Sequence, residues 1–466
     1  MSFKNDYISK FLPPLAFACF LGGCAAVTGH KGEIDNFNSS LKSNNCDFRM
    51  IEAKIKDDND TILWGIQGGA LARNCMNYKR SIIFFDKAEE KYKEDVDKDN
   101  LGNNALESIT SVFINNNVNS YEGNTYEKVM VNTYKALNFA SLNDHQNARI
   151  EFNRALDRQR RAKEYFQSEI KKRKEELSKK ENEKKDKNVT QEIDRMKVAK
   201  NKKTQDTIYE KYNSLLNDFD AYPDFINPFT TYIAGIYFML NGDSSKARNL
   251  LKESVSMAPK NKQILSDFKL NDKYITSIKQ SKDNYVWVIY ENGEAMIKDE
   301  IRIDIPLFLF TKKVYYTGIV LPKIIEKNSS YEYLNVAGEN TVSICNMDNV
   351  IKTEFKKRFP LIVTEAVLNT VTKTLGQKKL VKEGGLIGGI VGALYQGLTN
   401  KADVRSWTAL PKNFQSIRVK NTGIPLKIKD NKGKVIKTIL LPKNKNAMIY
   451  VKSQNLGNNI VHKIIF

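Results

Sequence analysis

With 466 residues, of which 41% are hydrophobic, the chain is long enough for two or three domains with ordinary cores. Its mean hydropathy of −0.49 and the lack of any uninterrupted apolar run long enough to cross a bilayer exclude a bundle of membrane-spanning helices. The 74 Lys and Arg against 54 Asp and Glu give a formal net charge of +20, an excess that suggests nucleic acid or an anionic membrane surface as partners. Because no nucleic-acid-binding motif accompanies the charge, no nucleic-acid partner is predicted.

The N-terminal residues have the three parts of an export signal. Lys4 and Lys10 form a positive region, and Phe11–Leu21 is an apolar segment too short to span a bilayer. Leu21-Gly22-Gly23-Cys24 then matches the lipobox pattern of an aliphatic residue, two small residues and cysteine. We predict that residues 1–23 are a lipoprotein signal peptide and that Cys24, lipidated, begins the mature chain. An ordinary signal peptide with an incidental cysteine, or a buried N-terminal helix, remains the alternative.

Lipidation of Cys24 adds a diacylglycerol and an amide-linked acyl chain such as palmitate. Together these chains exceed the two lipid signals that stable membrane anchoring requires. The residue after the cysteine is Ala25 and not Asp, as in lipoproteins that are sorted to the outer membrane. The sequence therefore predicts a lipid-anchored protein on the periplasmic face of the outer membrane.

Export to the periplasm implies an oxidising compartment. Three cysteines remain outside the signal and the lipidation site: Cys46, Cys75 and Cys345. Cys46 and Cys75 lie in consecutive predicted helices, so a disulfide between them is one possibility. Three buried free thiols are the other.

Residues 24–264 are predicted to form a helical domain built from repeats. In three segments a small residue is followed by a second small residue twelve positions later, then by an apolar residue after four and a small residue after three more. The segments are the glycine-rich stretch Trp64–Ala72 with Ser81, Phe85 and Ala88; Ala136 with Ala148, Phe152 and Ala155; and Gly235 with Ala247, Leu251 and Ser254. This is the spacing of tetratricopeptide repeats, in which two antiparallel helices approach so closely that only small residues fit where they cross. An ordinary pair of amphipathic helices is the alternative.

Two short motifs stand outside these repeats. Tyr121-Glu122-Gly123 is followed by Tyr126-Glu127, and far downstream the chain reads Ala402-Asp403-Val404-Arg405-Ser406-Trp407. With these motifs in this order, the chain resembles a family of uncharacterised bacterial envelope lipoproteins with tetratricopeptide-like helices. The resemblance covers most of the mature chain and implies location and architecture more than activity. Members of that family resemble accessory lipoproteins encoded near activators of peptidoglycan synthases.

The motif residues are candidates for partner binding or for a structural role: Tyr121, Glu122, Tyr126, Glu127, Asp403, Arg405 and Trp407. Glu122 and Glu127 lie at a junction between a loop and a helix, where carboxylates more simply cap the helix than form a catalytic pair. Asp403, Arg405 and Trp407 follow a glycine-rich segment, and we expect them to pair and stack so that they lock this helix against a sheet.

Residues 160–215 are predicted to form a charged helical arm. Lys171–Lys203 alternates basic with acidic residues and has few large apolar side chains, so a continuous coiled coil is not expected. The tip of the arm should be solvated. It either contacts anionic lipid headgroups or an acidic face of a partner, or is a solvated insertion without a partner.

Residues 265–466 are predicted to form an α+β domain with a mainly antiparallel sheet, because strand follows strand through short turns. The first expected strands are Tyr285–Tyr290, Ile301–Phe310, Val314–Leu321 and Val336–Cys345. A helix over Val350–Leu380 leads into the glycine-rich stretch Gly384–Leu398. We interpret this stretch as a buried or groove-lining helix and not as an interfacial membrane element, because it is short for a membrane span.

Four further strands are expected after the second motif: Gln415–Val419, Leu426–Ile428, Val435–Leu441 and Ala447–Val451. They should form a small β-unit that is added to the first sheet as a sandwich.

The sequence carries no constellation typical of catalysis. The three histidines, His30, His145 and His462, are spread over distant elements, and no nucleophile elbow, phosphate-binding loop or clustered cysteine set accompanies them. We therefore predict no enzyme activity, no cofactor and no metal site.

The fold class expected from these elements is α+β. The expected function is a non-catalytic scaffold or adaptor that presents a concave helical groove to a periplasmic protein partner, in cell-envelope assembly or in the regulation of peptidoglycan synthesis. One alternative is a structural subunit of a large periplasmic assembly such as a flagellar or secretion machine. Another is a factor that binds or modifies peptidoglycan. The partner and the oligomeric state stay open.

Overall fold

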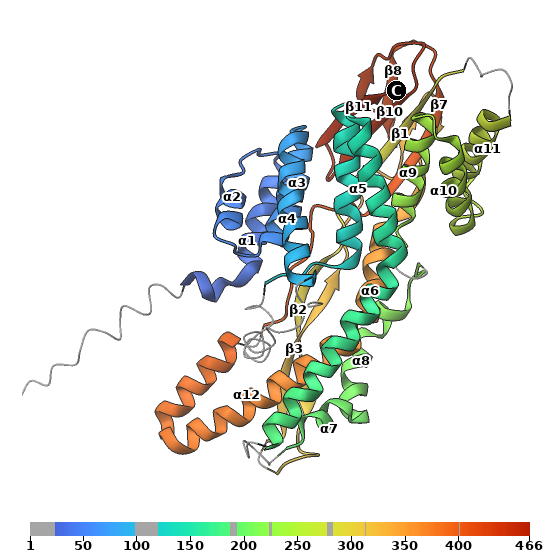
Figure 1. Cartoon of the computed structure of the whole chain (residues 1–466). Coiled ribbons are helices and arrows are strands. Elements are labelled where there is room, and N and C mark those ends of the chain that lie inside the picture. Colours follow the sequence, from blue (N-terminus) through green and yellow to red (C-terminus); the bar gives the residue numbers. More distant parts are fainter. Residues whose placement is uncertain are drawn as a thin grey trace, which may run out of the picture.

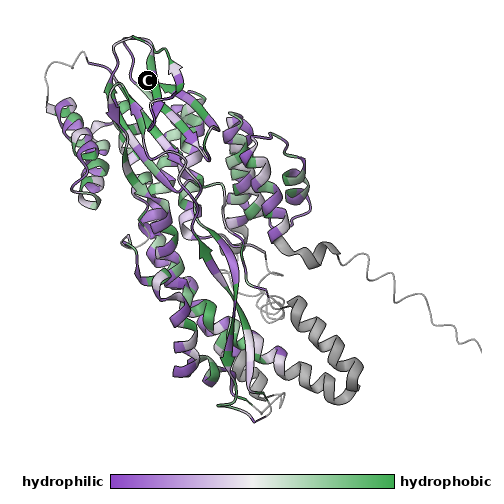
Figure 2. Cartoon of the chain, turned by 180° about the vertical axis from the view of Figure 1, so that it is seen from behind, coloured by the Kyte–Doolittle hydropathy of each residue, from purple (hydrophilic) through white to green (hydrophobic). Residues whose placement is uncertain are grey.

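The computed structural model describes residues 24–97, 120–186, 193–222, 226–276, 283–312, 314–399 and 401–466. Helices dominate the first part of the chain and strands the last part, so the predicted α+β class is confirmed. Figures 1 and 2 show an elongated molecule from two opposite sides. Within the described residues, no helix combines the length and apolar character needed to cross a bilayer.

The helices are α1 (Cys24–Lys42), α2 (Arg49–Lys56), α3 (Thr61–Asn74), α4 (Tyr78–Asp97), α5 (Thr125–Ser141), α6 (His145–Asp186), α7 (Arg195–Lys200), α8 (Lys202–Asn217), α9 (Pro228–Leu240), α10 (Ser244–Met257), α11 (Lys262–Thr276) and α12 (Met347–Thr399). The strands are β1 (Tyr285–Asn292), β2 (Ile297–Pro306), β3 (Tyr316–Ile325), β4 (Leu334–Val336), β5 (Glu339–Asn340), β6 (Val342–Asn346), β7 (Asn413–Lys420), β8 (Leu426–Asp430), β9 (Val435–Ile439), β10 (Ala447–Ser453) and β11 (Asn459–Ile465).

The three predicted repeats form the helical hairpins α3–α4, α5–α6 and α9–α10. The small residues of the spacing pattern are buried where the paired helices cross. A Cβ atom added to Gly69 would lie 2.3 Å from the Phe85 ring, and the Ser81 hydroxyl donates a 2.6 Å hydrogen bond to the Gly69 carbonyl oxygen. Steric demand at the crossing therefore explains the pattern.

The turns of the hairpins use residues that tolerate a left-handed backbone. Asn143 lies between α5 and α6 with φ of 60°, and Gly242 lies between α9 and α10 with φ of 82°. The next residue in the second turn, Asp243, accepts a hydrogen bond from the Lys246 amide and so caps α10.

The predicted helical arm is present, but its return half is packed against the rest of the molecule, and its tip, at residues 187–192, lies outside the described residues. α6 spans 42 residues, about 63 Å at the usual helical rise, and crosses most of the molecule in Figure 1. The chain then returns through α7 and α8, which pack against α12 and β2. The Tyr212 ring of α8 lies 4.3 Å from the Phe359 ring of α12. The prediction missed this packing because the apolar residues of α8 contact elements that are distant in sequence.

Two sheets form most of the C-terminal region. A five-stranded sheet has the order β11-β10-β1-β7-β6, with β1 and β10 parallel and its other pairs antiparallel. A four-stranded sheet has the order β5-β4-β8-β9. The predicted strand over Val336–Cys345 is wrong in its extent, because the chain turns at Ala337 and Gly338, which have positive φ, and divides its residues among β4, β5 and β6.

Side chains alternate between the two faces of β1, as the pleat of a strand requires. Val286, Val288 and Tyr290 face the four-stranded sheet, and this small second core corresponds to the predicted sandwich. Trp287 and Ile289 face the helices and belong to the main core.

One main core runs through both halves of the chain, from Phe37 in α1 to Ile464 in β11. The domain boundary expected between residues 264 and 265 lies within α11.

The predicted helix over Val350–Leu380 is present as part of α12. The prediction that Gly384–Leu398 is buried concerns side chains outside the described set, although the backbone is helical through Thr399.

Candidate functional site: the motif junction

The two sequence motifs meet in a buried cluster, which we call the motif junction. It consists of Asp60, Tyr121, Glu127, Asp403, Arg405 and Trp407. These residues come from the start of α3, the start of α5 with its preceding loop, and the segment between α12 and β7. Segments separated by up to 347 positions in sequence are thus in direct contact at this point.

Arg405 lies at the centre of the junction, and its side chain is only 2% exposed. Its Nη1 atom donates to both carboxylate oxygens of Asp60, at 2.8 and 3.0 Å. Its Nε and Nη2 atoms donate to Asp403, at 2.9 and 3.0 Å. The guanidinium also lies 5.5 Å from the centre of the Tyr121 ring, within the range of a cation–π contact. A buried arginine is tolerated here because two carboxylates neutralise it.

Asp60 links the first motif to the second. It lies just before α3 in a left-handed conformation, with φ of 53°. Its Oδ1 atom accepts a 2.8 Å hydrogen bond from the Tyr121 amide as well as the hydrogen bond from Arg405. One carboxylate therefore holds the loop before α5 and the second motif together.

Glu127 completes the link from the helix side. Its carboxylate accepts hydrogen bonds from the Tyr121 hydroxyl, at 2.7 and 2.9 Å, and from the Trp407 amide at 2.8 Å. It also accepts from the Asn124 amide as part of a capping box at the start of α5. The predicted capping role of Glu127 is confirmed, and the same carboxylate also holds the second motif.

Trp407 anchors the second motif in the helical core. Its ring makes edge contacts with Phe85 of α4 and Tyr134 of α5, each at 5.7 Å between centroids. On either side of it, Gln67 of α3 donates to the Ser406 carbonyl at 3.2 Å and to the Thr408 hydroxyl at 3.0 Å. The expectation that these residues lock the glycine-rich helix against a sheet stays a prediction, because the side chains of that helix lie outside the described residues. The motif residues lock α3, α4 and α5, because Asp60, Phe85 and Glu127 supply the matching contacts.

A second ion-pair group continues from the junction along α12. Glu354 accepts hydrogen bonds from the Thr125 and Tyr126 amides at the start of α5, at 2.9 and 3.1 Å. Glu354 also pairs with Arg358, which pairs in turn with Glu169 of α6. This group joins α5, α6 and α12.

A cavity of about 200 Å³ opens beside the junction, between the loop before α5, α6, β3, α12 and residues 401–405. The three arginines in its wall already have carboxylate partners. Burial lowers the pKa of Lys298, whose amine donates a 3.2 Å hydrogen bond to the Arg405 carbonyl oxygen, and lowers the pKa of Lys373 to about 8. Because Glu169, Glu365 and Asp403 line the same cavity, carboxylates of the wall compete with any anionic ligand for these amines.

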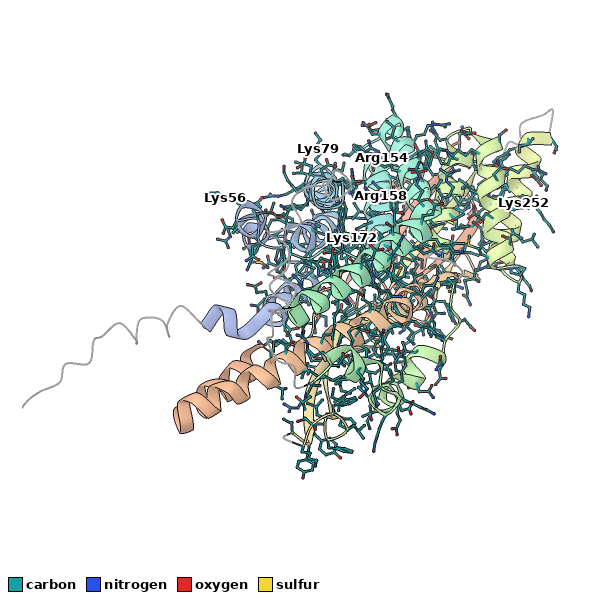
Figure 3. All side chains as sticks on the ribbon, turned by 60° about the horizontal axis from the view of Figure 1, so that its bottom comes forward. Lys56, Lys79, Arg154, Arg158, Lys172 and Lys252 are labelled. Atoms are coloured by element: carbon teal, nitrogen blue, oxygen red, sulfur yellow. A yellow bond between two sulfur atoms is a disulfide. The ribbon has the colours of Figure 1, made fainter. Side chains whose placement is uncertain are left out.

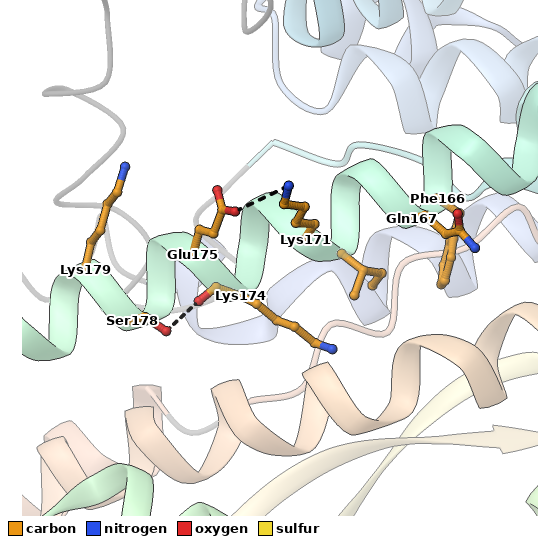
Figure 4. A pocket seen from close by; sticks show the side chains of 8 residues that line it. Phe166, Gln167, Lys171, Lys174, Glu175, Ser178 and Lys179 are labelled. Carbon is orange, nitrogen blue, oxygen red and sulfur yellow. Dashed lines mark hydrogen bonds and ion pairs between the residues drawn. The ribbon is translucent and has the colours of Figure 1, made fainter.

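A separate groove of about 600 Å³ runs along α6 (Figure 4). Its lining comes from one face of this helix, where Phe166 and Ile170 are flanked by Lys171, Lys174 and Lys179. Ligand sites generally combine polar groups that converge from several elements. A groove lined by one helix face is therefore a weaker candidate than the cavity beside the junction.

The other predicted site residues have simpler surroundings. Cys46 and Cys75 form a disulfide, and Cys345 is a buried free thiol whose pKa is raised by burial to about 12. Tyr126 is buried beside Glu127, whereas Glu122 is half exposed and pairs with Arg173 of α6 at 2.6 Å. The side chain of Cys24 lies outside the described set.

Sequence reasoning missed Asp60, Gln67 and Glu354. The run Asp57-Asp58-Asn59-Asp60 before α3 resembles an ordinary helix start, and nothing in it indicates a partner 345 positions downstream.

The described residues contain no group of three or more His, Cys, Asp or Glu arranged to hold a metal ion. Comparisons with known protein families, with curated protein sequences and with solved structures found no match to this chain.

Proposed function

We propose that this protein is a lipid-anchored, non-catalytic scaffold of the bacterial cell envelope, held on the periplasmic face of the outer membrane through Cys24. The lipobox Leu21–Cys24 supports the location. The observation that carries the scaffold role is the motif junction. Its motif residues, such as Arg405 and Trp407, bind other parts of the same chain.

The junction changes the mechanism that the sequence suggested. α3 and α9 are buried almost throughout, and Phe229 of α9 stacks on Phe414 of β7 at 3.6 Å between ring centroids. The face of the helices that would line a groove for a partner is therefore covered by the C-terminal half. A partner must instead bind the outer surface of the molecule.

The outer helical surface carries basic side chains on several elements. The residues labelled in Figure 3 come from α2, α4, α6 and α10. Lys56, Lys79, Lys172 and Lys252 are exposed, whereas Arg154 pairs with Glu151 and Arg158 pairs with Glu89. A protein partner with an acidic face would complement this surface, and the charge would chiefly speed the association. A rigid body with one shared core suits this role, because it holds the binding surface at a constant geometry.

Crosslinking of the full chain in cells, followed by mass spectrometry, tests the proposal. One protein partner crosslinked to the outer faces of α4, α6 or α10 supports the scaffold. Crosslinks only between copies of this chain would favour a subunit of a large assembly. Binding of muropeptides to the full chain, without a protein partner, would contradict the scaffold and favour a peptidoglycan-binding factor.

Replacement of the lipidation site, Cys24→Ala, tests the location. We expect most of the variant to leave the outer-membrane fraction, because no acyl chains can be attached. The measurement is the distribution of the protein between soluble and membrane fractions. A Cys345→Ala variant, which removes a buried thiol instead, should fractionate as the unmodified chain does. Equal outer-membrane recovery of the Cys24→Ala variant would refute the anchor.

A further inference from the structure

The hairpin β2–β3 ends in an exposed apolar cluster. The two strands pair over ten residues, from Ile297 opposite Ile325 to Pro306 opposite Tyr316. At its end, four large side chains are exposed to solvent: Phe308 (37%), Leu309 (45%), Tyr315 (72%) and Tyr316 (59%). We call residues 307–312 with 314–316 the hairpin tip. Large apolar side chains gathered in this way generally mark an interaction site.

The hairpin tip has a defined shape. The amides of Leu307 and Phe308 donate to the Tyr315 carbonyl oxygen, at 2.9 and 3.0 Å, and the Thr311 amide donates to the Leu307 carbonyl oxygen at 3.0 Å. Leu307 is fully buried, and the Phe308 and Tyr316 rings make an edge contact at 5.6 Å. The exposed side chains are therefore held outward by a hydrogen-bonded turn.

Basic residues surround the hairpin tip. The amine of Lys203, at the start of α8, lies 5.1 Å from the centre of the Phe308 ring. Lys200 ends α7, Lys202 begins α8 and Lys312 lies in the hairpin tip itself, and all three are exposed. The chain has no acidic residue between Ile305 and Tyr316. The surface thus combines exposed aromatic rings with a positive surround.

This combination matches the interface of an anionic bilayer. Aromatic side chains are enriched at the level of the lipid headgroups, because their rings are apolar and tyrosine also has a polar hydroxyl. Lysine side chains at the same level extend toward the headgroups and are attracted by anionic lipids.

The hairpin also starts close to the predicted anchor. The Lys31 amine of α1 pairs with Asp299 of β2 at 2.6 Å. From Lys31 to Cys24 is about 10 Å of helix, and from Asp299 to the hairpin tip is about 30 Å of strand. The path from Cys24 through this ion pair to the hairpin tip is therefore about 40 Å.

We propose that the hairpin tip is a membrane-contact site that inserts its exposed apolar side chains into the interface of an anionic bilayer. The contact goes beyond the proposed scaffold function and needs no lipid anchor. In an anchored protein it would be a second attachment point, and two points set the orientation of the elongated body relative to the membrane.

Binding of unlipidated protein to vesicles tests this contact. The protein is the chain from residue 24 onward with Cys24→Ala, and the vesicles are either phosphatidylcholine alone or equal parts of phosphatidylethanolamine and phosphatidylglycerol. We expect cosedimentation with the anionic vesicles only, decreasing with added salt. A Leu309→Ser/Tyr315→Ser variant should lose about tenfold or more in binding. A Lys203→Gln variant should lose about fivefold, as expected for one basic residue at an anionic surface.

The matched control is Ile424→Ser/Leu456→Ser, which removes two exposed apolar side chains (71% and 69%) from loops of the C-terminal sheet region. This variant should bind as the parent does. A Tyr315→Trp variant should show a blue shift of its fluorescence with anionic vesicles, since the three native tryptophans are buried.

Unchanged binding of the tip variant, equal loss in the control, or no binding by the parent protein would overturn the proposal. Dimerisation of the parent protein that the tip variant abolishes would also overturn it, because the hairpin tip would then be a contact between copies of this chain. None of these outcomes affects the anchor, which the fractionation of the Cys24→Ala variant tests separately.

Discussion

At the scale of single residues, Arg405 connects segments that lie far apart in the sequence. Its guanidinium holds Asp60 before α3 and Asp403 before β7, and it lies against the Tyr121 ring. A charge buried in this way contributes little net stability when it is paired, but the loss of one partner is costly because the other is left unpaired.

We expect Arg405→Ala to lower the free energy of unfolding by about 3 to 5 kcal/mol, since the buried Asp60 carboxylate loses its cation. Urea denaturation followed by circular dichroism measures the change. The control is Arg302→Ala, which removes an arginine that is 70% exposed and pairs with Asp304 at 3.5 Å. It should cost less than about 1 kcal/mol. Similar losses for both variants would contradict the role of the junction.

Asp403 predicts how this stabilisation depends on pH. Burial acts to raise the pKa of Asp403, but attraction and hydrogen bonds to Arg405 outweigh burial and lower the pKa below its ordinary value. A carboxylate with a lowered pKa in the folded state adds stability above its unfolded-state pKa of about 3.9, and this stability is lost as the pH falls through the folded-state value.

We therefore expect Asp403→Asn to be less stable than the unmodified chain at neutral pH, with a difference that shrinks below about pH 4. Urea denaturation of both proteins across a pH series measures this difference. A difference that stays constant from neutral to acidic pH would show that the ionised form of Asp403 is not what stabilises the junction.

At the scale of elements, the helical hairpins follow from local steric demand. Spacings of twelve, four and three residues bring a small residue on one helix opposite a large one on the next, and this relation involves neighbouring helices only. The packing of α7 and α8 against α12 was not predictable in the same way. Tyr209 and Tyr212 pack on Phe359, about 150 positions downstream.

The glycine positions can be tested with one type of substitution. Gly69→Ala should destabilise the protein by about 1 to 3 kcal/mol, because its Cβ would overlap the Phe85 ring. Gly32→Ala should have the opposite sign, stabilising by up to about 1 kcal/mol, since α1 has open space at this position and alanine favours helix. The midpoints of urea denaturation give both values. The same sign for both variants would contradict the close crossing of α3 and α4.

At the scale of the whole molecule, the helical and sheet regions share one main core. The main core contains Trp64 and Tyr232 from the helices together with Trp287 and Trp407 from the C-terminal half. Several buried polar contacts cross the same boundary. They include the hydrogen bonds of the Tyr232 hydroxyl with the Ser416 hydroxyl at 3.0 Å and of the Gln67 amide with the Thr408 hydroxyl at 3.0 Å.

We predict that residues 265–466 do not fold as an isolated fragment, because Trp287 and Phe414 would lose the helices that cover them. The far-ultraviolet circular dichroism spectrum and the solubility of the purified fragment are the measurements. The control is the chain from residue 24 to 466, which should unfold in a single transition. A soluble fragment with a native-like spectrum would show that the two regions are independent domains.

The sequence alone determined the features that depend on neighbouring residues: the three helical hairpins, the cap at Glu127 and the strand at Tyr285–Tyr290. The export signal with its lipobox is read from the same kind of local pattern and stays a prediction. Each depends on spacings within a few turns of chain, so local geometry is sufficient to predict it. Tertiary structure alone decided that Arg405 meets Asp60, that Trp407 packs on α4 and α5, and that the C-terminal half covers the inner face of the helices. These contacts join residues hundreds of positions apart, and a charge or ring in one segment gives no local signal of the partner that will neutralise or cover it.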